Sequence, residues 1–348
     1  MRFRLLAGIV VLPALLSGMV LAADASERFD WSTADLSYVG DYAKEAEPTR
    51  KLCAGVIHAE PPAADRPTAA EAKALKDCDS EALYYGIGMP ADPVKARKCA
   101  LIEDGREPYG GPSQPYYGRA MLAIIYANGI GAEQNYDVAI HMTCGLDNAP
   151  AEVEPRLDRL AKLRTAMVAK PNFDTCLDTS SGALAGMCAA HDYALNDKAR
   201  RNRIDRIGSA WTKAQRAFLE RSYDSAADYA STLHEMDCFR GTLQSACTTA
   251  AADEFLEDFT KRLEALGRGE AARLETRTDA VRRKLAREAA RASKEDDDWM
   301  GEEKSWYDAN ERETAEKRVK FERDLVAFAR AVFPTVSSHR VRRIFADM

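Results

Sequence analysis

The stretch "FDTCLDTSSGALAGMCAAHDYALNDKARRNRIDRIGSAWTKAQRAFLERSYDSAADYA", residues 173–230, decides the fold of this chain. Cys176 and Cys188 precede one helix, and Cys238 and Cys247 lie in the loop beyond a second helix. We therefore expect a small helical hairpin fastened by disulfides. Such a construction is typical of proteins that fold outside the reducing cytosol.

The first 25 residues have the pattern of a cleaved signal peptide. Arg2 and Arg4 form a positive start, an apolar run from Leu5 to Leu16 follows, and small residues then offer sites to a signal peptidase. The run is close to the lower limit for a bilayer span, so we expect cleavage rather than an anchor. The cleavage region contains no cysteine for a lipid anchor. We expect a periplasmic or secreted protein without membrane insertion.

Length and charge narrow the class of partner. The chain has 348 residues, which is enough for two or three domains. Its formal net charge is −6, and it becomes more negative when Arg2 and Arg4 leave with the signal peptide. An acidic balance argues against a nucleic-acid partner. It favours association with a basic protein, although the same charge also serves solubility alone.

The cysteine pattern favours disulfides over a metal site. All 8 cysteines follow the signal peptide, and their even number permits full pairing. We expect neither a metal nor a cofactor, because no CxxC pair occurs and the 5 histidines are scattered. His141 with Cys144, and His234 with Cys238, have helical spacing but would need two further ligands.

A change in composition divides the chain at a proline-rich stretch. Residues 26–68 contain a short helix and then a linker, "HAEPPAADRPT", with three prolines. Thr68 and Glu71 have capping-box spacing, so a long helical region begins at about Ala69. Beyond that point no stretch alternates as a strand would, and helix-forming residues dominate. The sequence therefore predicts an all-α protein.

Two stretches of the helical region repeat one another. The first, "ALYYGIGMPADPVKARKCALIEDG", begins at Ala82, and the second, "AMLAIIYANGIGAEQNYDVAIHMTCGLDNAP", begins at Ala120. In each copy a helix ends at Gly-Ile-Gly, whose glycines favour the left-handed turn that closes a helix. Asp92 and Pro93 suit the start of the helix that follows in the first copy. The spacing of the copies is within the range of helical solenoid repeats.

These copies resemble the Sel-one-like repeat, a relative of the tetratricopeptide repeat, over about residues 70–148. The matching features are small residues and tyrosine on the first helix, Y-x-x-G-x-G at its end, and K-A on the second helix. A long spacer from Asp104 to Gln114 departs from the pattern. A helix from Glu152 to Met167 is expected to cap the stack, giving a repeat domain over 69–170. The resemblance implies a scaffold for protein contacts without a catalytic group.

Residues 171–267 carry an ordered set of features. They are, in order, "FD-x-C" from Phe173, Met187-Cys188, Leu195-Asn196, "AQRAF" from Ala214, Arg221, and a cysteine-bearing loop with Gly241-Thr242. This set resembles the N-terminal domain of the LprI-type bacterial lysozyme inhibitors. The short loop between Cys238 and Cys247, and Phe218 where the family often has tryptophan, are departures. The resemblance implies a non-catalytic protein that binds a lysozyme or another muramidase.

The second helix of this region has an apolar and a polar side. Trp211, Phe218 and Leu219 lie one or two turns apart and are expected to pack against the first helix, at residues such as Ile204. Three polar residues flank this stripe and are candidates for contacts with a partner: Gln215, Arg216 and Arg221. The alternative is that they form a solvated helix face.

Two expected disulfides, Cys176–Cys188 and Cys238–Cys247, each close a short loop. Each bridge adds about 2–3 kcal/mol to a unit whose core is small. Four cysteines remain: Cys53, Cys78, Cys99 and Cys144. They allow three possible connectivities. Cys78 and Cys99 fall on the two helices of the first repeat and would face one another, which leaves Cys53 for Cys144.

The last segment, residues 268–348, faintly repeats part of the same region. "WTKAQRAF" from Trp211 and "WMGEEKSW" from Trp299 share aromatic ends and a Gln/Glu–Arg/Lys pair. We therefore expect either a degenerate second hairpin without cysteines or a charged helical tail.

The sequence favours a protein-binding function over catalysis. No nucleophile with a base, phosphate loop or pair of catalytic carboxylates stands out, and Ser180-Ser181-Gly182 has no nearby histidine as a partner. We expect a short helical-repeat solenoid followed by a disulfide-stapled hairpin or bundle, acting as an exported relative of lysozyme inhibitors. The alternative is a repeat scaffold for envelope proteins. The sequence does not set the oligomeric state.

Overall fold

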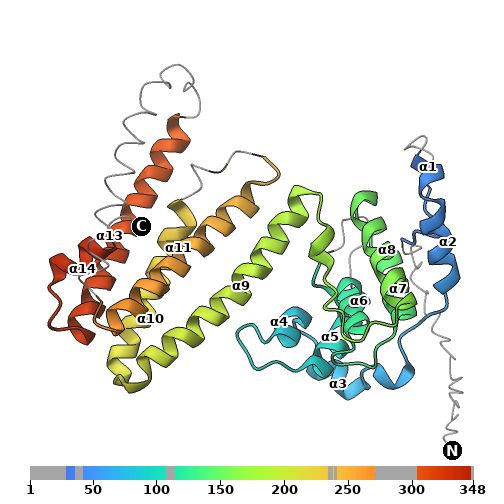
Figure 1. Ribbon diagram of the computed structural model, residues 1–348, viewed down its shortest axis with the longest axis horizontal. Helices are drawn as coiled ribbons and strands as arrows, with labels where there is room; N and C mark the ends of the chain where they lie inside the picture. The colour runs from blue at the N-terminus through green and yellow to red at the C-terminus, as the bar shows by residue number, and fades with distance from the viewer. Residues whose placement is uncertain are drawn as a thin grey trace, which may run out of the picture.

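The computed structural model describes residues 29–35, 42–106, 114–233, 238, 241–270 and 304–345. Within these ranges all regular secondary structure is helical, which confirms the all-α class (Figure 1). The expected signal peptide, residues 1–25, lies outside the described residues, as does Trp299 of the C-terminal repeat. Among the helices in these ranges, none combines the length and the apolar character that a bilayer crossing requires.

The first unit contains the two sequence repeats. Its helices are α1 (Tyr42–Glu45), α2 (Glu47–Val56), α3 (Ala69–Ala74), α4 (Ser80–Tyr85), α5 (Pro93–Asp104), α6 (Gly118–Asn128), α7 (Tyr136–Cys144) and α8 (Pro150–Thr165). From α4 to α8 each helix packs against the next one in the chain. The pairs α4–α5 and α6–α7 therefore lie next to one another, and α8 packs against α7.

Local chemistry explains where these helices begin and end. Thr68 and Glu71 form the predicted capping box at the start of α3, each side chain accepting a backbone N–H of the other residue. Three further side chains cap the helices of the repeats: Asp79 at α4, Asp92 at α5 and Asn135 at α7. Gly86 (φ 68°) and Gly129 (φ 63°) end α4 and α6 in the left-handed conformation, as the Gly-Ile-Gly turns predict.

Helix α6 is the centre of the first unit, because every one of its 11 residues is buried. The segment before the repeats belongs to the same core. Trp31 is 1% exposed, and its indole N–H donates to the carbonyl of Leu146 at 3.0 Å. Phe173, which follows α8, is buried there too, with its backbone N–H and carbonyl both bonded to the Asn128 side chain. The core of this unit thus reaches from the start of the described chain to the beginning of the stapled segment.

The second unit joins the stapled segment to the C-terminal helices. Its helices are α9 (Gly182–Ile207), α10 (Lys213–Leu233), α11 (Gln244–Gly267), α13 (Lys304–Val332) and α14 (Ser338–Ile344). Rings from three helices pack together in its core: Tyr229 of α10, Phe255 and Phe259 of α11, and Phe321 of α13. Helix α10 packs mainly along α13 and α9 mainly along α11, so α9 and α10 diverge from their shared turn (Figure 1).

Trp211 packs against the core that contains Ile204 and also has aromatic partners that the sequence did not predict. Its ring lies 5.6 Å from that of Phe328 and 6.0 Å from that of Phe333, so its aromatic partners come from the C-terminal segment. Residue 211 precedes α10 and has an extended backbone after a 3₁₀ turn, so its side chain does not continue the α10 stripe. Leu219 and Ile204 do share one buried core, as predicted.

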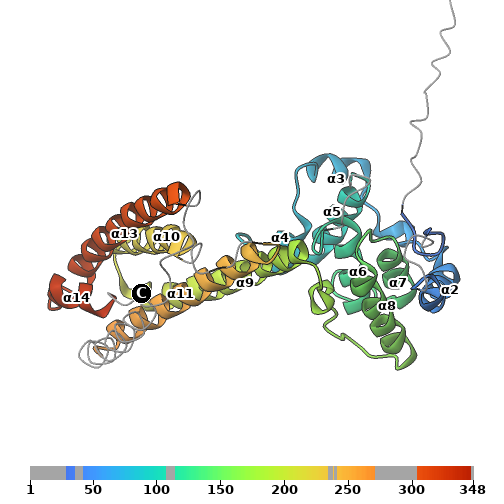
Figure 2. The same ribbon diagram turned by 90° about the horizontal axis from the view of Figure 1, so that it is seen from above.

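Helices α9 and α11 run side by side in the same direction (Figure 2). Gly182 lies against Thr242 near their first turns, and Ile207 lies against Gly267 at their ends. A Cβ at Gly182 would collide with the Thr242 carbonyl, so only glycine permits this close approach.

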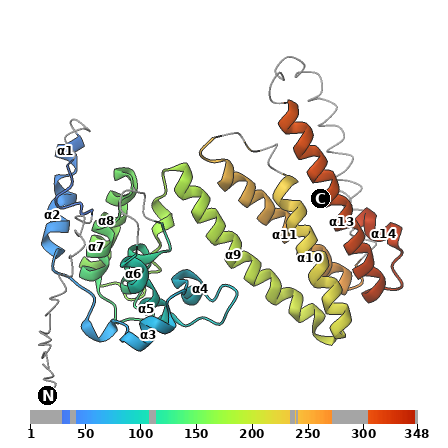
Figure 3. The same cartoon turned by 180° about the vertical axis from the view of Figure 1, so that it is seen from behind.

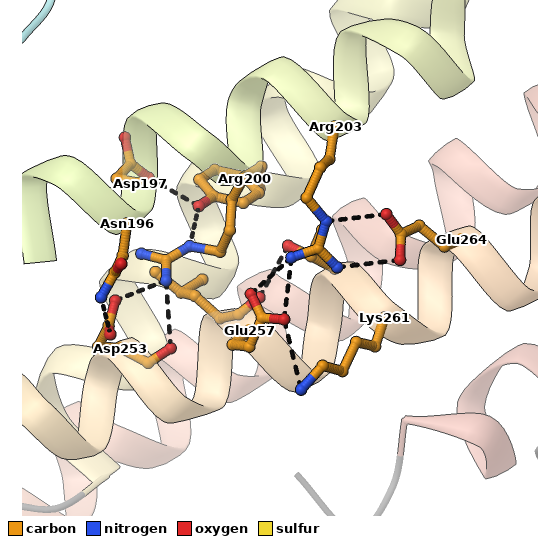
Figure 4. Close-up of polar contacts among 11 residues, drawn as sticks. Asn196, Asp197, Arg200, Arg203, Asp253, Glu257, Lys261 and Glu264 are labelled. Carbon is orange, nitrogen blue, oxygen red and sulfur yellow. Dashed lines mark hydrogen bonds and ion pairs between the residues drawn. The ribbon is translucent and has the colours of Figure 1, made fainter.

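Farther along, arginines of α9 bind carboxylates of α11 (Figure 4). Arg203 donates two hydrogen bonds to Glu257 and two to Glu264, all at 2.8–2.9 Å. The buried Arg200 donates to Asp253 at 2.5 Å. Because bidentate guanidinium–carboxylate pairs fix both distance and orientation, they set the register of the two helices. Helix α9 is therefore held firmly against α11 within the second unit.

All four expected disulfides are present: Cys53–Cys144, Cys78–Cys99, Cys176–Cys188 and Cys238–Cys247. Among the three connectivities open to the first four cysteines, the structure has the one that pairs Cys78 with Cys99. Cys188 and Cys247 lie inside α9 and α11 rather than in loops, and Cys78 lies between α3 and α4 rather than on a helix. Four disulfides are typical of an oxidising, exported environment.

Candidate functional site

Gln215, the first candidate binding residue, serves the start of α10. Its side-chain oxygen accepts the backbone N–H of Thr212 at 2.9 Å, and the Thr212 hydroxyl accepts the backbone N–H of Gln215 at 3.2 Å. This reciprocal pair is a capping box. The Gln215 amide also donates to the carbonyl of Ala331 in α13 at 2.9 Å. Its polar groups are therefore engaged within the fold.

Arg216 and Arg221 are exposed, and each has a local partner. Arg216 donates to the carbonyl of Trp211 at 2.7 Å and borders a cavity of about 240 Å³ between α9 and α10. The guanidinium of Arg221 lies 4.5 Å from the centre of the Phe218 ring. Of the three candidates, Arg216 alone is among the described residues that line this cavity.

One group of potential metal ligands is present in the first unit. Ligand atoms of Cys78, Cys99 and Glu103 lie within 4.8 Å of one another. Both sulfurs are joined in a disulfide, so neither is available as a thiolate ligand. This cluster is part of the fold rather than a metal centre.

A cleft of about 460 Å³ lies where α9 crosses the first repeat, and α4 is beside α9 at this point (Figure 3). One wall consists of residues of α9 at helical spacing: Met187, Ala190, His191 and Ala194. The other walls come from the first unit: Cys78, Asp79, Glu81, Ala82, Ile87, Glu103 and residues 114–117. Both units therefore contribute to a single cavity, and such junctions are preferred ligand sites.

His191 is the buried side chain of the α9 wall, 3% exposed. Its Nδ1 lies 2.5 Å from a carboxylate oxygen of Glu81, and its ring stacks on Tyr116 with 3.7 Å between ring centres. In the neutral imidazole the carboxylate holds the proton on Nδ1, which leaves a lone pair on Nε2. Within the described ranges Nε2 has no hydrogen-bond partner. This nitrogen is an unused acceptor at the wall of the cleft.

The tyrosines around His191 remain protonated. The Tyr116 hydroxyl donates to Asp174 at 2.9 Å, and the edge of Tyr85 contacts the imidazole. Burial raises the pKa of both hydroxyls, and the nearby Asp174 carboxylate raises each further. Burial also raises the pKa of Asp192, beside His191. The surroundings of the imidazole are aromatic and acidic.

Glu103 fixes the wall opposite α9. It is buried and accepts the backbone N–H groups of Ser80 at 3.0 Å and Gly118 at 3.1 Å, together with the Ser80 hydroxyl at 2.5 Å. Burial raises the pKa of Glu103, although these hydrogen bonds act in the opposite direction. Because both of its oxygens are occupied, Glu103 joins the start of α4 to the start of α6 instead of facing a ligand.

The groups left free in the cleft are hydrogen-bond acceptors. Asp79 uses one carboxylate oxygen to cap α4, and Glu81 uses one oxygen for His191, so each keeps a second oxygen. No lysine or arginine is among the described residues that line the cleft. The Ser80 hydroxyl faces Glu103 rather than His191. The arrangement has binding groups, but its serine is not placed for nucleophilic attack.

The sequence alone does not single out these residues as a site. Glu81 and His191 are 110 positions apart, and they meet only because α9 lies across α4. The one local signal is the small-residue face of α9, where Ala190 and Ala194 accompany a histidine. That pattern equally describes a helix packed in a core.

No protein-family model, curated protein or solved structure matches this chain. The resemblances to Sel-one-like repeats and to lysozyme inhibitors therefore rest on the motifs quoted above. The function has to be argued from the site and its chemistry.

Proposed function

We propose that this chain is an exported, periplasmic protein that binds another protein, without catalysis, in the manner of lysozyme inhibitors. The observation that carries the proposal is the cleft between two disulfide-stapled units, which holds free acceptors and whose lining, in the part of the chain that the structure describes, places no nucleophile against His191. The signal-like first 25 residues and the four disulfides support an exported location.

The stapled loops of the second unit support an inhibitor-like mode of binding. Leu177 is 58% exposed and follows Cys176, and Leu243 is 61% exposed and lies between Cys238 and Cys247. The contact of Gly182 with Thr242 brings the two stapled segments together. A disulfide restricts the conformations of the segment that it closes, so apolar side chains beside such bridges lose less entropy on binding and suit insertion into a muramidase cleft.

The test is a titration of lysozymes of several structural classes with the oxidised protein while cell-wall lysis is followed. The proposal predicts that lysis by at least one class falls at micromolar protein or below. Leu177→Asp weakens the inhibition, whereas Val319→Asp, at an exposed apolar position of α13, leaves it unchanged. Full lysis by every class at micromolar protein contradicts the inhibitor function.

A second candidate, an envelope scaffold built on the two repeats, is favoured by a specific feature of the first unit. Met89, Val94 and Ile130 are exposed in and beside the turns of the two copies. Gly131 lies against the backbone of Pro93, which places the turns of both copies at one edge. An apolar edge shared by neighbouring helix pairs is a common protein-binding surface.

The scaffold is distinguished from the inhibitor by a substitution at this edge. Ile130→Asp abolishes capture of a periplasmic partner if the repeats are the binding surface, and it leaves inhibition of lysis intact if they are not. Capture that is unchanged by Ile130→Asp contradicts the scaffold function.

A further inference from the structure

We propose that the cleft between α4 and α9 receives an arginine side chain of the protein partner. This inference rests on the proposed protein-binding function and adds the chemistry of the partner at one site. The cleft joins carboxylates, an acceptor nitrogen and aromatic rings, and these are the groups that a guanidinium binds.

Three hydrogen-bond acceptors in the cleft are available to a ligand. The second carboxylate oxygens of Asp79 and Glu81 and the Nε2 lone pair of His191 belong to three residues that line the same cleft. Most of the His191 side chain is buried, but its residue lines the cleft, so a donor that enters the cleft can reach the Nε2 acceptor. A guanidinium offers five N–H donors in one plane and no acceptor, so it complements all three groups.

Among the described residues, no cation of the protein lines the cleft. Lys198 of α9 donates to the carbonyl of Tyr85 at 2.7 Å, at the end of α4. Arg156 is buried near Glu152, Asp174 and Tyr116 and is not part of the cleft lining, and in the part of the chain that the structure describes its Nε and one Nη have no hydrogen-bond partner. The Asp79 and Glu81 carboxylates are therefore available to attract an external cation. Their negative potential is strengthened because the cleft walls have a low dielectric constant.

The remaining lining suits the stem of an arginine. Tyr117 is an aromatic side chain of the lining, whereas Tyr116 is already stacked on His191, and Met187 is an exposed apolar side chain on the α9 wall. A guanidinium over an aromatic face gains a cation–π interaction, and its aliphatic stem packs against apolar groups. The whole chain is also acidic, which speeds encounter with a basic partner.

The experiment is an NMR titration of the oxidised, full-length protein with the peptide acetyl-Gly-Arg-Gly-amide. The matched control is the same peptide with citrulline, which has nearly the same shape and no charge. The proposal predicts saturable shifts of the amides of Glu81, Ala82 and Ala190 with the arginine peptide, and binding at least about fivefold weaker with citrulline.

Variants assign the binding to the cleft. Asp79→Asn removes one charge but keeps a residue that caps α4 well, so the fold is retained. Asp79→Asn and Glu81→Gln each weaken the arginine peptide several-fold, whereas Glu254→Gln, at an exposed position on α11, has no effect. Unfolding curves of Asp79→Asn check that the fold is unchanged.

Three results overturn the inference: no shift at the cleft, equal binding of the citrulline peptide, or equal binding by Asp79→Asn. A free polyamine such as spermidine that binds more tightly than the arginine peptide assigns the cleft to small cations and overturns it as well. Inhibition of lysis is measured separately. A lysozyme that is inhibited equally by wild type and Asp79→Asn refutes the arginine site while the proposed function stands.

Discussion

Removal of the Cys53–Cys144 bridge is the perturbation whose effect the structure defines best. The bridge joins α2 to α7 across 91 positions, and its cysteines are 1% and 0% exposed. It holds the segment before the repeats, which includes Trp31, onto the core around α6. Alanine is the replacement of choice at both positions, because serine would bury two hydroxyl groups.

The magnitude follows from the loop that each bridge closes in the unfolded chain. The chain-entropy relation gives about 4.6 kcal/mol for the 91-residue separation of Cys53 and Cys144. It gives about 2.6 kcal/mol for the 9-residue separation of Cys238 and Cys247. The expected difference is therefore about 2 kcal/mol. The larger loss is a substantial fraction of a typical domain's 5–15 kcal/mol.

The assay is hydrogen exchange read by mass spectrometry over a urea series, with oxidised wild type and the two double alanine variants. Peptides from α6 report the free energy of unfolding of the first unit, and peptides from α11 report that of the second. The Cys53/Cys144 variant lowers protection in α6, and the Cys238/Cys247 variant lowers protection in α11 by a smaller amount. A smaller loss for Cys53/Cys144 than for Cys238/Cys247 refutes the loop-length reasoning.

Two further predictions concern single residues. Glu103→Ala leaves the N–H groups of Ser80 and Gly118 without a buried acceptor, so urea unfolding shows a loss of about 2–3 kcal/mol in the first unit. Burial raises the pKa of Glu103 above its usual 4.5, so the folded state binds this proton at higher pH than the unfolded state does. The stability of the wild type relative to Glu103→Ala therefore rises as the pH falls toward 4.5. A stability difference between the two proteins that does not change with pH contradicts this. Gln215→Ala removes the capping box with Thr212 and costs about 1 kcal/mol in urea unfolding, while inhibition of lysis stays the same. Loss of inhibition in a variant that is still folded contradicts this and indicates that Gln215 contacts the partner.

The helix ends and the disulfides could be predicted from the sequence because their causes are local. Thr68 with Glu71 caps a helix wherever that helix lies, and Gly86 permits the left-handed turn that its φ of 68° requires. Cys78 lies just before α4 and Cys99 lies on α5 of the same repeat, so their pairing is a contact within one repeat and was correctly predicted.

The cleft and the aromatic partners of Trp211 could not be predicted from the sequence, because both depend on contacts between distant parts of the chain. Glu81 meets His191 only when α9 lies across α4, and no local pattern encodes that crossing. Trp211 meets Phe328 because α13 packs along α10. Gln215 was chosen as a candidate binding residue because it is polar, but its side chain already caps the start of α10.

The most direct test of the account is lysis by a panel of lysozymes titrated with the oxidised protein. The account predicts that lysis by at least one structural class falls to background as the protein approaches one equivalent at micromolar concentration. Lysis that continues at its full rate with every class, at the same concentrations, contradicts it.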